Sequence, residues 1–204
     1  MNGAIKKLLR FFYYLPSNLV NRILYVLKNV RVGKNHETKG ILYIKNKGTI
    51  TIGDRVRINS KGKANPIGGG EKTYLQVLKN GMLTIGNDVG MSNCAITCAD
   101  CVTIGNFVRI GAGVKIYDTD FHSLNPFERT AKPEIPAAIH KPVVIEDYAF
   151  IGAGSYILKG VTVGKYSVVG AGSVVTKQIP EGEIWAGNPA KKIGTVPGVE
   201  PQTK

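Results

Sequence analysis

The chain has 204 residues, with 43% hydrophobic residues, 25 glycines and a formal net charge of +13. This hydrophobic content is sufficient for a folded core and excludes an intrinsically disordered chain. The basic residues are dispersed and form no nucleic-acid-binding motif, so we expect a phosphate-bearing ligand or an anionic membrane as partner and no nucleic acid. Three cysteines, an odd number, fit a reducing compartment.

Residues 3–30 are predicted to be helical, because apolar side chains recur at steps of three and four residues. These are Ile5, Leu8, Leu9, Phe12, Leu15, Leu19, Ile23, Leu27 and Val30. Pro16 is expected to split the segment, with Ser17 or Asn18 capping the second helix. The apolar stripe is expected to cover the N-terminal end of the fold, and peripheral contact of residues 3–30 with a membrane is the alternative.

The start of the chain does not have the pattern of a signal peptide. The apolar run from Phe11 to Leu15 is ended by Pro16, which makes it shorter than the ~7–15-residue core of a signal peptide. No stretch approaches the ~18 apolar residues that would span a bilayer. We therefore expect a cytoplasmic protein, at most peripheral to the inner face of the membrane.

Between residues 145 and 180 an aliphatic residue recurs at every sixth position, in Ile145, Ile151, Ile157, Val163, Val169 and Val175. A period of six fits neither a helix nor a plain strand. It fits a solenoid in which each short strand and its corner use one hexapeptide, so that three strands form a triangular coil of about 18 residues. The aliphatic side chains are expected to fill the core, and the glycines that often follow them to allow sharp corners.

The pattern continues upstream, in Ile104, Ile110 and Ile116 and, less regularly, in Ile52, Ile58, Ile85 and Met91. The interval from Ile85 to Ile104 contains one residue more than a coil needs, and the interval from Ile116 to Ile145 leaves room for a loop. We therefore predict an all-β protein: an N-terminal helical segment at 1–40, a parallel β-helix at 41–181 with loops at 61–80 and 123–142, and an extended C-terminal tail at 182–204.

Three segments accompany the repeat: YDTDFHS at 117–123, GAGSVVTK at 170–177 and AGNPAK at 186–191. With them, residues 40–195 resemble the left-handed β-helix acyltransferases, and among these the sugar O-acetyltransferases of the galactoside and maltose type and their surface-polysaccharide relatives. The resemblance implies acetyl-CoA as co-substrate, a sugar or polysaccharide acceptor such as a capsule or O-antigen unit, and a homotrimer with active sites between subunits.

Within this resemblance, His122 matches the catalytic histidine, and it ends a coil at the point where the second loop leaves. A neutral imidazole is suited to accept the proton of a sugar hydroxyl near pH 7. Asp120, or Asp118, is expected to fix the tautomer of the ring. Asn93 matches an acceptor-site residue that would bind the sugar or the developing oxyanion.

The same resemblance places acetyl-CoA in a groove between coils. Ala153 and Ala171 match positions where a small side chain lets the pantetheine arm approach the backbone. Thr176 and Lys177 match the nucleotide end, where a cation would hold phosphate. Three tail residues are expected to add to this site: Trp185 beside the adenine, and Lys191 and Lys192 beside the phosphates.

Cys94, Cys98 and Cys101 have the spacing of radical-SAM iron–sulfur enzymes. They lie within the repeat, however, and Cys98 is six positions before Ile104, at an inward position where a small apolar side chain fits. The zinc carbonic anhydrases with the same solenoid need three converging histidines, and no short-spaced histidine pair is present here. We therefore expect no metal.

Three alternatives to O-acetylation stay open. The protein could N-acetylate an amino sugar or nucleotide sugar, accept its acyl group from an acyl carrier protein, or act as a binding scaffold without catalysis. The matches at Thr176 and Lys177 favour free coenzyme A over a carrier protein. The acceptor sugar and the hydroxyl position are not specified by the sequence.

Overall fold

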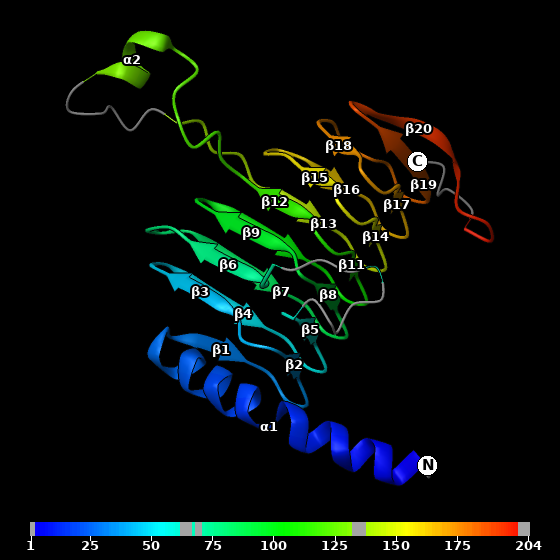
Figure 1. Cartoon of the computed structure of the whole chain (residues 1–204). Helices are drawn as coiled ribbons and strands as arrows, with labels where there is room; N and C mark the ends of the chain where they lie inside the picture. Colours follow the sequence, from blue (N-terminus) through cyan, green and yellow to red (C-terminus); the bar gives the residue numbers. More distant parts are fainter. Residues whose placement is uncertain (1–2, 62–66, 68–70, 132–137, 200–204) are drawn as a thin grey trace.

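The computed structural model describes residues 3–61, 67, 71–131 and 138–199, and only the helical backbone for residues 3–14. Helix α1 (Gly3–Leu27) lies across one end of a stack of short strands, and helix α2 (Pro126–Thr130) lies on a loop that projects from the stack (Figure 1). The strands wind into successive coils, as the hexapeptide period predicts.

Three sheets form the sides of this stack. Their strands are parallel and come from successive coils, except for the last strand of the chain, which is antiparallel to its neighbour. Sheet A is ordered β1 (Val30–Val32), β4 (Thr49–Ile52), β7 (Met82–Ile85), β10 (Cys101–Ile104), β13 (Val143–Ile145), β16 (Thr162–Val163). Sheet B is ordered β2 (Glu37–Lys39), β5 (Arg57–Asn59), β8 (Gly90–Ser92), β11 (Arg109–Ile110), β14 (Phe150–Ile151), β17 (Val168–Val169), β19 (Glu183–Gly187), β20 (Ala190–Thr195). Sheet C is ordered β3 (Tyr43–Asn46), β6 (Tyr74–Val77), β9 (Ala95–Cys98), β12 (Lys115–Tyr117), β15 (Tyr156–Ile157), β18 (Val174–Val175).

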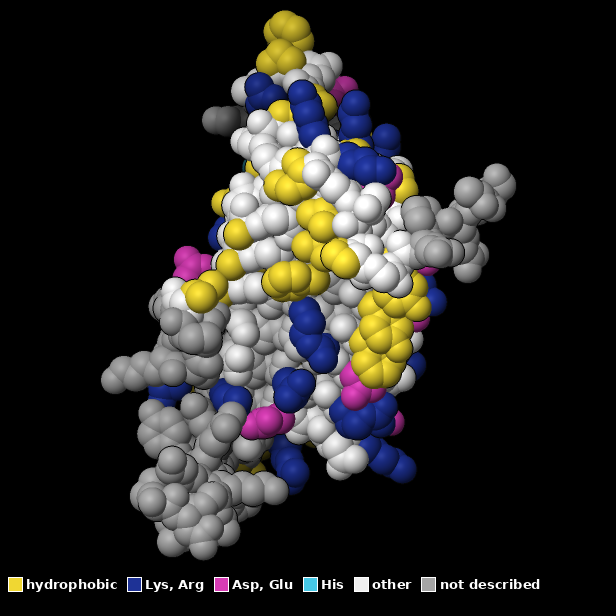
Figure 2. Space-filling model, turned by 90° about the vertical axis from the view of Figure 1, so that its right-hand side faces the viewer, with side chains coloured by type: hydrophobic (Ala, Val, Ile, Leu, Met, Phe, Trp, Pro, Cys, Tyr) yellow, Lys and Arg dark blue, Asp and Glu magenta, His cyan; other side chains and the backbone are white. Residues whose placement is uncertain are grey.

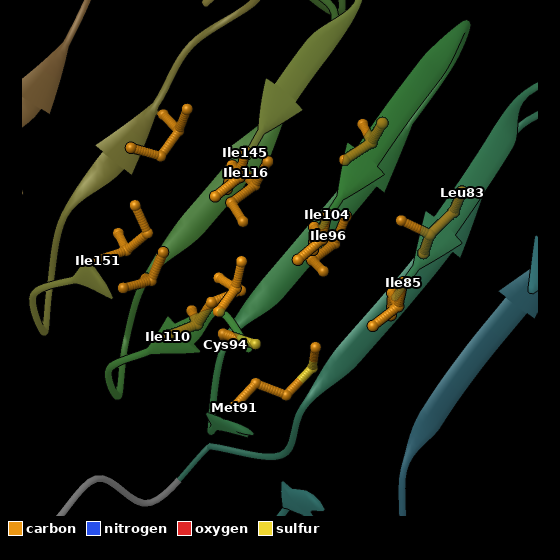
Figure 3. Close-up of a cluster of buried hydrophobic side chains, with 14 of the residues drawn as sticks. Leu83, Ile85, Met91, Cys94, Ile96, Ile104, Ile110, Ile116, Ile145 and Ile151 are labelled. Carbon is orange, nitrogen blue, oxygen red and sulfur yellow. The ribbon is translucent and has the colours of Figure 1, made fainter. Parts of the chain in front are cut away.

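The core is a column of aliphatic side chains that point inward from the three sheets (Figure 3). In sheet A, Ile85, Ile104, Ile145 and Val163 pair in register through four coils, and each is at most 1% exposed. Burial of each such side chain contributes roughly 1.5–3 kcal/mol relative to exposure. The predicted inward positions of the hexapeptides are therefore confirmed as the core.

The corner between sheets A and B is held by a ladder of side-chain amides and carboxylates. Asp54, Asn87, Asn106 and Asp147 occupy equivalent positions in successive coils, and each accepts a hydrogen bond of 2.6–2.9 Å from the backbone N–H of the equivalent residue one coil earlier. Four groups that would otherwise lack backbone partners are thus satisfied. A Cβ at Gly53, beside the ladder, would lie 2.7 Å from backbone atoms of the next coil, which explains the glycine there.

The β-helix begins earlier than predicted and includes part of the predicted first loop. Strands β1 and β2 precede residue 41, and β6 lies within 61–80. The hexapeptide spacing does not predict these strands, because the early corners between sheets C and A are longer than those of the later coils. There the inward residues Ile96 and Ile104 are eight positions apart, whereas Ile157 and Val163 are six apart. Met91 and Ile96 are one position closer than in a regular hexapeptide, so the interval from Ile85 to Ile104 exceeds that of a regular coil by only one residue.

Helix α1 covers the first coil, and it is continuous: Pro16 lies inside it, contrary to the predicted division into two helices. The buried amide of Asn21 donates to the carbonyl of Gly40 at 2.8 Å and accepts from the N–H of Leu42 at 3.0 Å. The buried Tyr25 hydroxyl lies 3.2 Å from Thr38 Oγ1. These bonds tie the helix to the edge strands that it protects. Within the described part of the chain, no helix combines the length and apolarity needed to cross a membrane.

The C-terminal segment is a hairpin that extends sheet B, where we predicted an extended tail. Strand β19 pairs parallel with β17, and β20 pairs antiparallel with β19. Trp185 is in register with the inward-facing Val169 and packs against the core. The hairpin thereby covers the C-terminal end of the hydrophobic column.

Candidate functional site

The second loop leaves the corner between sheets C and A and is held closed at its stem. After β12, the buried carboxylate of Asp118 accepts the backbone N–H groups of Ala99 and Asp100 at 2.7 and 2.8 Å. Its carbonyl accepts the N–H of Lys141 at 2.9 Å, and Thr119 forms an antiparallel bridge with His140. Asp118, one of the two residues predicted to orient His122, therefore has both carboxylate oxygens engaged by the corner.

Asp120 and His122 follow on this stem. Asp120 Oδ1 forms an ion pair with Lys159 Nζ at 2.8 Å, while its Oδ2 is buried and has no hydrogen-bond partner among the described residues. Phe121 has a φ of 62°, and the N–H of His122 donates to the carbonyl of Asp120 at 2.7 Å. His122 is thus exposed two residues after Asp120, whose buried Oδ2 has no donor among the described residues.

Thr176 and Lys177 are exposed on the same edge, in the turn that follows β18. Strands β12, β15 and β18 are neighbours in sheet C, so the turn lies two strand spacings, or ~10 Å, from the stem of the His122 loop. Lys159, in the coil between them, completes the edge. The structure thus brings together four of the predicted site residues: Asp120, His122, Thr176 and Lys177.

The other edge of sheet C, where it meets sheet B, carries Asn93 before β9, Ala153 before β15 and Ala171 before β18, with one further coil between Asn93 and Ala153. Asn93 is buried, with a φ of 45°. Its Nδ2 donates to the carbonyl of Glu71, and its Oδ1 has no partner among the described residues. Small residues stack along this edge, including Gly113, Gly154 and Gly172, which are exposed and have φ values of 69–73°. Within one chain these residues face away from the His122 edge, because sheet C separates the two.

The tail begins at the edge between sheets B and C, where the carbonyl of Trp185 accepts the N–H of Gly170 at 2.8 Å, away from the His122 edge. Trp185 Nε1 donates to Glu183 Oε2 at 2.7 Å, and Lys192 Nζ forms a 2.7 Å ion pair with Glu183 Oε1. Burial raises the pKa of Glu183, but these two bonds outweigh it and lower the pKa below its usual value. Lys191 and Lys192 are on β20, at the border of sheet B, so the structure does not bring Trp185 or either lysine to Lys177.

The cysteines do not form a ligand set. Cys94 and Cys98 are buried, and burial raises the pKa of both thiols to about 12. The predicted inward position of Cys98 is confirmed. Across the described residues, no three His, Cys, Asp or Glu side chains are grouped as metal ligands would be.

One cavity was missed by the sequence reasoning. It has a volume of ≈ 290 Å³ and opens on the outer face of sheet B, where it is lined by Lys39, Arg57, Asn59, Gly90, Met91, Ser92, Arg109, Ile110, Gly111 and Phe150. Arg57 and Arg109 each precede an inward isoleucine in their hexapeptides, so their outward orientation was readable from the sequence. Their proximity depends on the register of β5, β8 and β11.

Comparison with known proteins relates the repeat to a family. A model of the bacterial transferase hexapeptide, with six repeats, matches residues 142–177. Nodulation protein L of Rhizobium leguminosarum bv. viciae is 48% identical over 99 residues, 48% of this chain and 50% of that protein. A putative acetyltransferase of Dictyostelium discoideum is 39% identical over 133 residues, 63% of this chain and 67% of that protein. The chain therefore spans about half the length of the first relative and two thirds of the second.

Two solved structures have the same architecture. A mutant of AntD, an N-acyltransferase from Bacillus cereus, in complex with dTDP-4-amino-4,6-dideoxyglucose and coenzyme A has a TM-score of 0.70 at 24% identity, over 86% of this chain and 89% of AntD. The hexapeptide-repeat acetyltransferase VCA0836 of Vibrio cholerae, in complex with acetyl-CoA, has a TM-score of 0.53 at 27% identity, over 84% of this chain and 75% of that one. The predicted left-handed parallel β-helix is thereby confirmed, and the chain belongs to the hexapeptide-repeat transferase family.

Proposed function

We propose that this protein transfers the acetyl group of acetyl-CoA to a sugar hydroxyl, in the biosynthesis of a surface polysaccharide. The observation that carries the proposal is the position of His122, exposed on the edge of sheets C and A and two residues from Asp120, whose Oδ2 has no donor among the described residues. The similarity to a putative acetyltransferase and to a structure that contains acetyl-CoA supports the donor. Because acetyl-CoA is the donor, we place the protein in the cytoplasm.

In this proposal His122 is the general base. Its ring accepts the proton of the acceptor hydroxyl while the oxygen attacks the thioester carbonyl carbon. The carbon–sulfur bond then breaks, and the imidazolium returns the proton to the departing thiolate. Asp120 accepts the other ring N–H, which holds the tautomer that leaves the reactive nitrogen unprotonated. The 2.8 Å ion pair with Lys159 holds the Asp120 side chain in place.

The cofactor residues fit the proposal if two subunits share each site. Lys177 offers an exposed ammonium for phosphate on the His122 edge, while Ala153 and Ala171 offer an accessible backbone on the opposite edge of sheet C. We therefore propose a homotrimer in which the His122 edge of one subunit meets the Ala171 edge of its neighbour. Asn93, on that second edge, has a buried side-chain oxygen, Oδ1, without a partner among the described residues, and we propose that it accepts a hydrogen bond from the acceptor sugar.

The test is release of free coenzyme A thiol from acetyl-CoA with a panel of sugar and amino-sugar acceptors, for wild type, His122→Ala and His140→Ala. His140 is the matched control, because it is an exposed histidine on the other strand of the same loop stem. We expect His122→Ala to lose at least ~10²-fold in turnover and His140→Ala to retain it.

Three other outcomes correspond to the alternatives. Transfer only to amino sugars would establish N-acetylation. Transfer only from an acylated carrier protein would replace the donor. No binding of acetyl-CoA by correctly assembled protein, together with equal behaviour of both histidine variants, would indicate a scaffold.

A further inference from the structure

The cavity on sheet B has a floor without long side chains and a cationic rim. Gly90 lies in register between Arg57 on β5 and Arg109 on β11, and Phe150 follows Arg109 on β14. A Cβ at Gly90 would lie 3.2 Å from Cδ of Arg109, so the glycine leaves room for the arginine to fold across it. Two positions further along the same two strands, Asn59 Nδ2 on β5 donates to Ser92 Oγ on β8 at 2.9 Å.

The cations of the rim are only partly compensated. Lys39 forms an ion pair with Glu37 at 3.7 Å. Asp88 forms a bidentate pair with Arg55 at 2.7 and 2.8 Å, and the hydrogen bonds of this pair lower the pKa of Asp88. Arg109 donates through one nitrogen to the carbonyls of Asp88, Phe107 and Val108, which fixes the guanidinium without neutralising it. The backbone N–H of Arg57 donates to the carbonyl of Val89 at 2.9 Å, whereas its guanidinium has no hydrogen bond or ion pair with any described residue. Figure 2, which faces this side of the molecule, shows Lys and Arg side chains at the upper end of the face and again over its lower half, where a few Asp and Glu side chains lie among them.

A second feature of the cavity suits a sugar. The Phe150 side chain is 47% exposed and forms an apolar wall beside polar Asn59 and Ser92. Aromatic faces pack against the C–H groups of sugar rings, while amide and hydroxyl groups exchange hydrogen bonds with sugar hydroxyls. Guanidinium groups pair with carboxylate and phosphate. The cavity therefore combines a sugar-binding wall with an anion-binding rim.

We propose that this cavity holds the acceptor and that the acceptor sugar carries an anionic group, a carboxylate or a phosphate. The assignment to the acceptor rests on the proposed acetyl transfer. The cavity borders the Asn93 edge through its neighbours Ser92 and Gly111, so a sugar bound there would present hydroxyls toward the subunit boundary. Arg57 and Arg109 would select the charge of the acceptor, and Phe150 would orient its ring.

The test is calorimetric titration at low ionic strength, without acetyl-CoA, of three probes matched in the sugar: methyl glucoside, glucuronate and glucose 1-phosphate. We expect at least one anionic probe to bind ~10-fold more tightly than the neutral one. Arg57→Gln should remove that preference. Arg31→Gln, an exposed arginine on sheet A, is the control and should retain it.

Preference for the uronate or for the phosphate identifies the source of the charge. Equal binding of all three probes, or a preference unchanged in Arg57→Gln, would overturn the proposal. Anion binding that survives while acetyl transfer from acetyl-CoA is absent would refute the proposed donor and leave the cavity assignment standing. Efficient acetylation of neutral sugars without anion binding would refute the cavity assignment and leave the proposed acetyl transfer standing.

Helix α1 carries an independent inference. Its buried residues Asn21 and Tyr25 face the first coil, while the opposite side is apolar and exposed, in Leu19 (60%), Ile23 (52%), Val26 (81%) and Leu27 (71%). These positions repeat at helical spacing. The helix contains Lys6, Lys7, Arg10 and Arg22 and no acidic residue. A second copy of this helix would bring like charges together, whereas an anionic bilayer would compensate them.

We infer that α1 docks the protein on an anionic membrane surface through this exposed face. In sedimentation with phosphatidylcholine vesicles that contain phosphatidylglycerol, wild type should bind, and Ile23→Glu with Val26→Glu should weaken binding at least ~10-fold. Phe127→Glu with Ile193→Glu is the control, since both residues are exposed and lie away from α1. No binding by wild type, or loss of self-association in the α1 variant without any vesicle binding, would refute the inference.

Discussion

A mixing experiment tests the shared active site most directly. Ala171 and Lys177 lie in the turns before and after β18, on opposite edges of sheet C. They are six residues apart, so the two edges are separated by at most ~20 Å, the span of a fully extended chain of that length. Because sheet C lies between them, one chain cannot place both edges against the same thioester. His122→Ala removes the base on one edge, and Ala171→Trp fills the exposed small-residue position on the other, so we expect each variant alone to be inactive.

Co-expression of the two variants should restore activity. A restored site needs its His122 edge from the Ala171→Trp subunit and its Ala171 edge from the His122→Ala subunit, which random assembly supplies in about a quarter of the sites. The assay is coenzyme A release by the purified mixture, with co-expressed wild type and His122→Ala as the control, expected at about half. Mixed assemblies of correct size that show no more activity than either parent would refute a site shared between chains.

Three further predictions concern the scaffold. Ile104→Ala should destabilise the protein by roughly 2–5 kcal/mol, read as a lower denaturation midpoint; an unchanged midpoint would contradict its place in the core. At Gly152 an added Cβ would lie 2.5 Å from a backbone nitrogen of the next coil, so Gly152→Ala should cost ~1–3 kcal/mol in the same measurement, and a neutral result would show that the coils can separate. At pH 8 a thiol reagent should modify Cys101 in the folded protein but reach Cys94 and Cys98 only on unfolding, since their raised pKa keeps both protonated; rapid reaction of all three would argue against their burial.

Much of the site depends on features that no sequence interval reveals. His122 was recognisable because it ends a regular coil at the loop, and the structure has it on the loop stem. Asp118 and Asp120 looked interchangeable in the sequence. The structure distinguishes them. Both carboxylate oxygens of Asp118 accept hydrogen bonds from backbone N–H groups of the corner, whereas Oδ2 of Asp120 has no partner among the described residues. Trp185, which we predict beside the adenine, is partly buried and packs against the end of the core, a contact that its sequence position does not reveal.

The sequence by itself determined the inward column and the period of the later coils, since each hexapeptide alternates one buried aliphatic position with a corner and this pattern is local. Only the tertiary structure decided where the early coils begin. The longer corners between sheets C and A change the number of residues between successive inward side chains, although the strands still stack in register. It also decided which edge each site residue occupies, and that Arg57 and Arg109 meet across Gly90. These relations depend on the accumulated length of every preceding corner and on register between strands far apart in the chain.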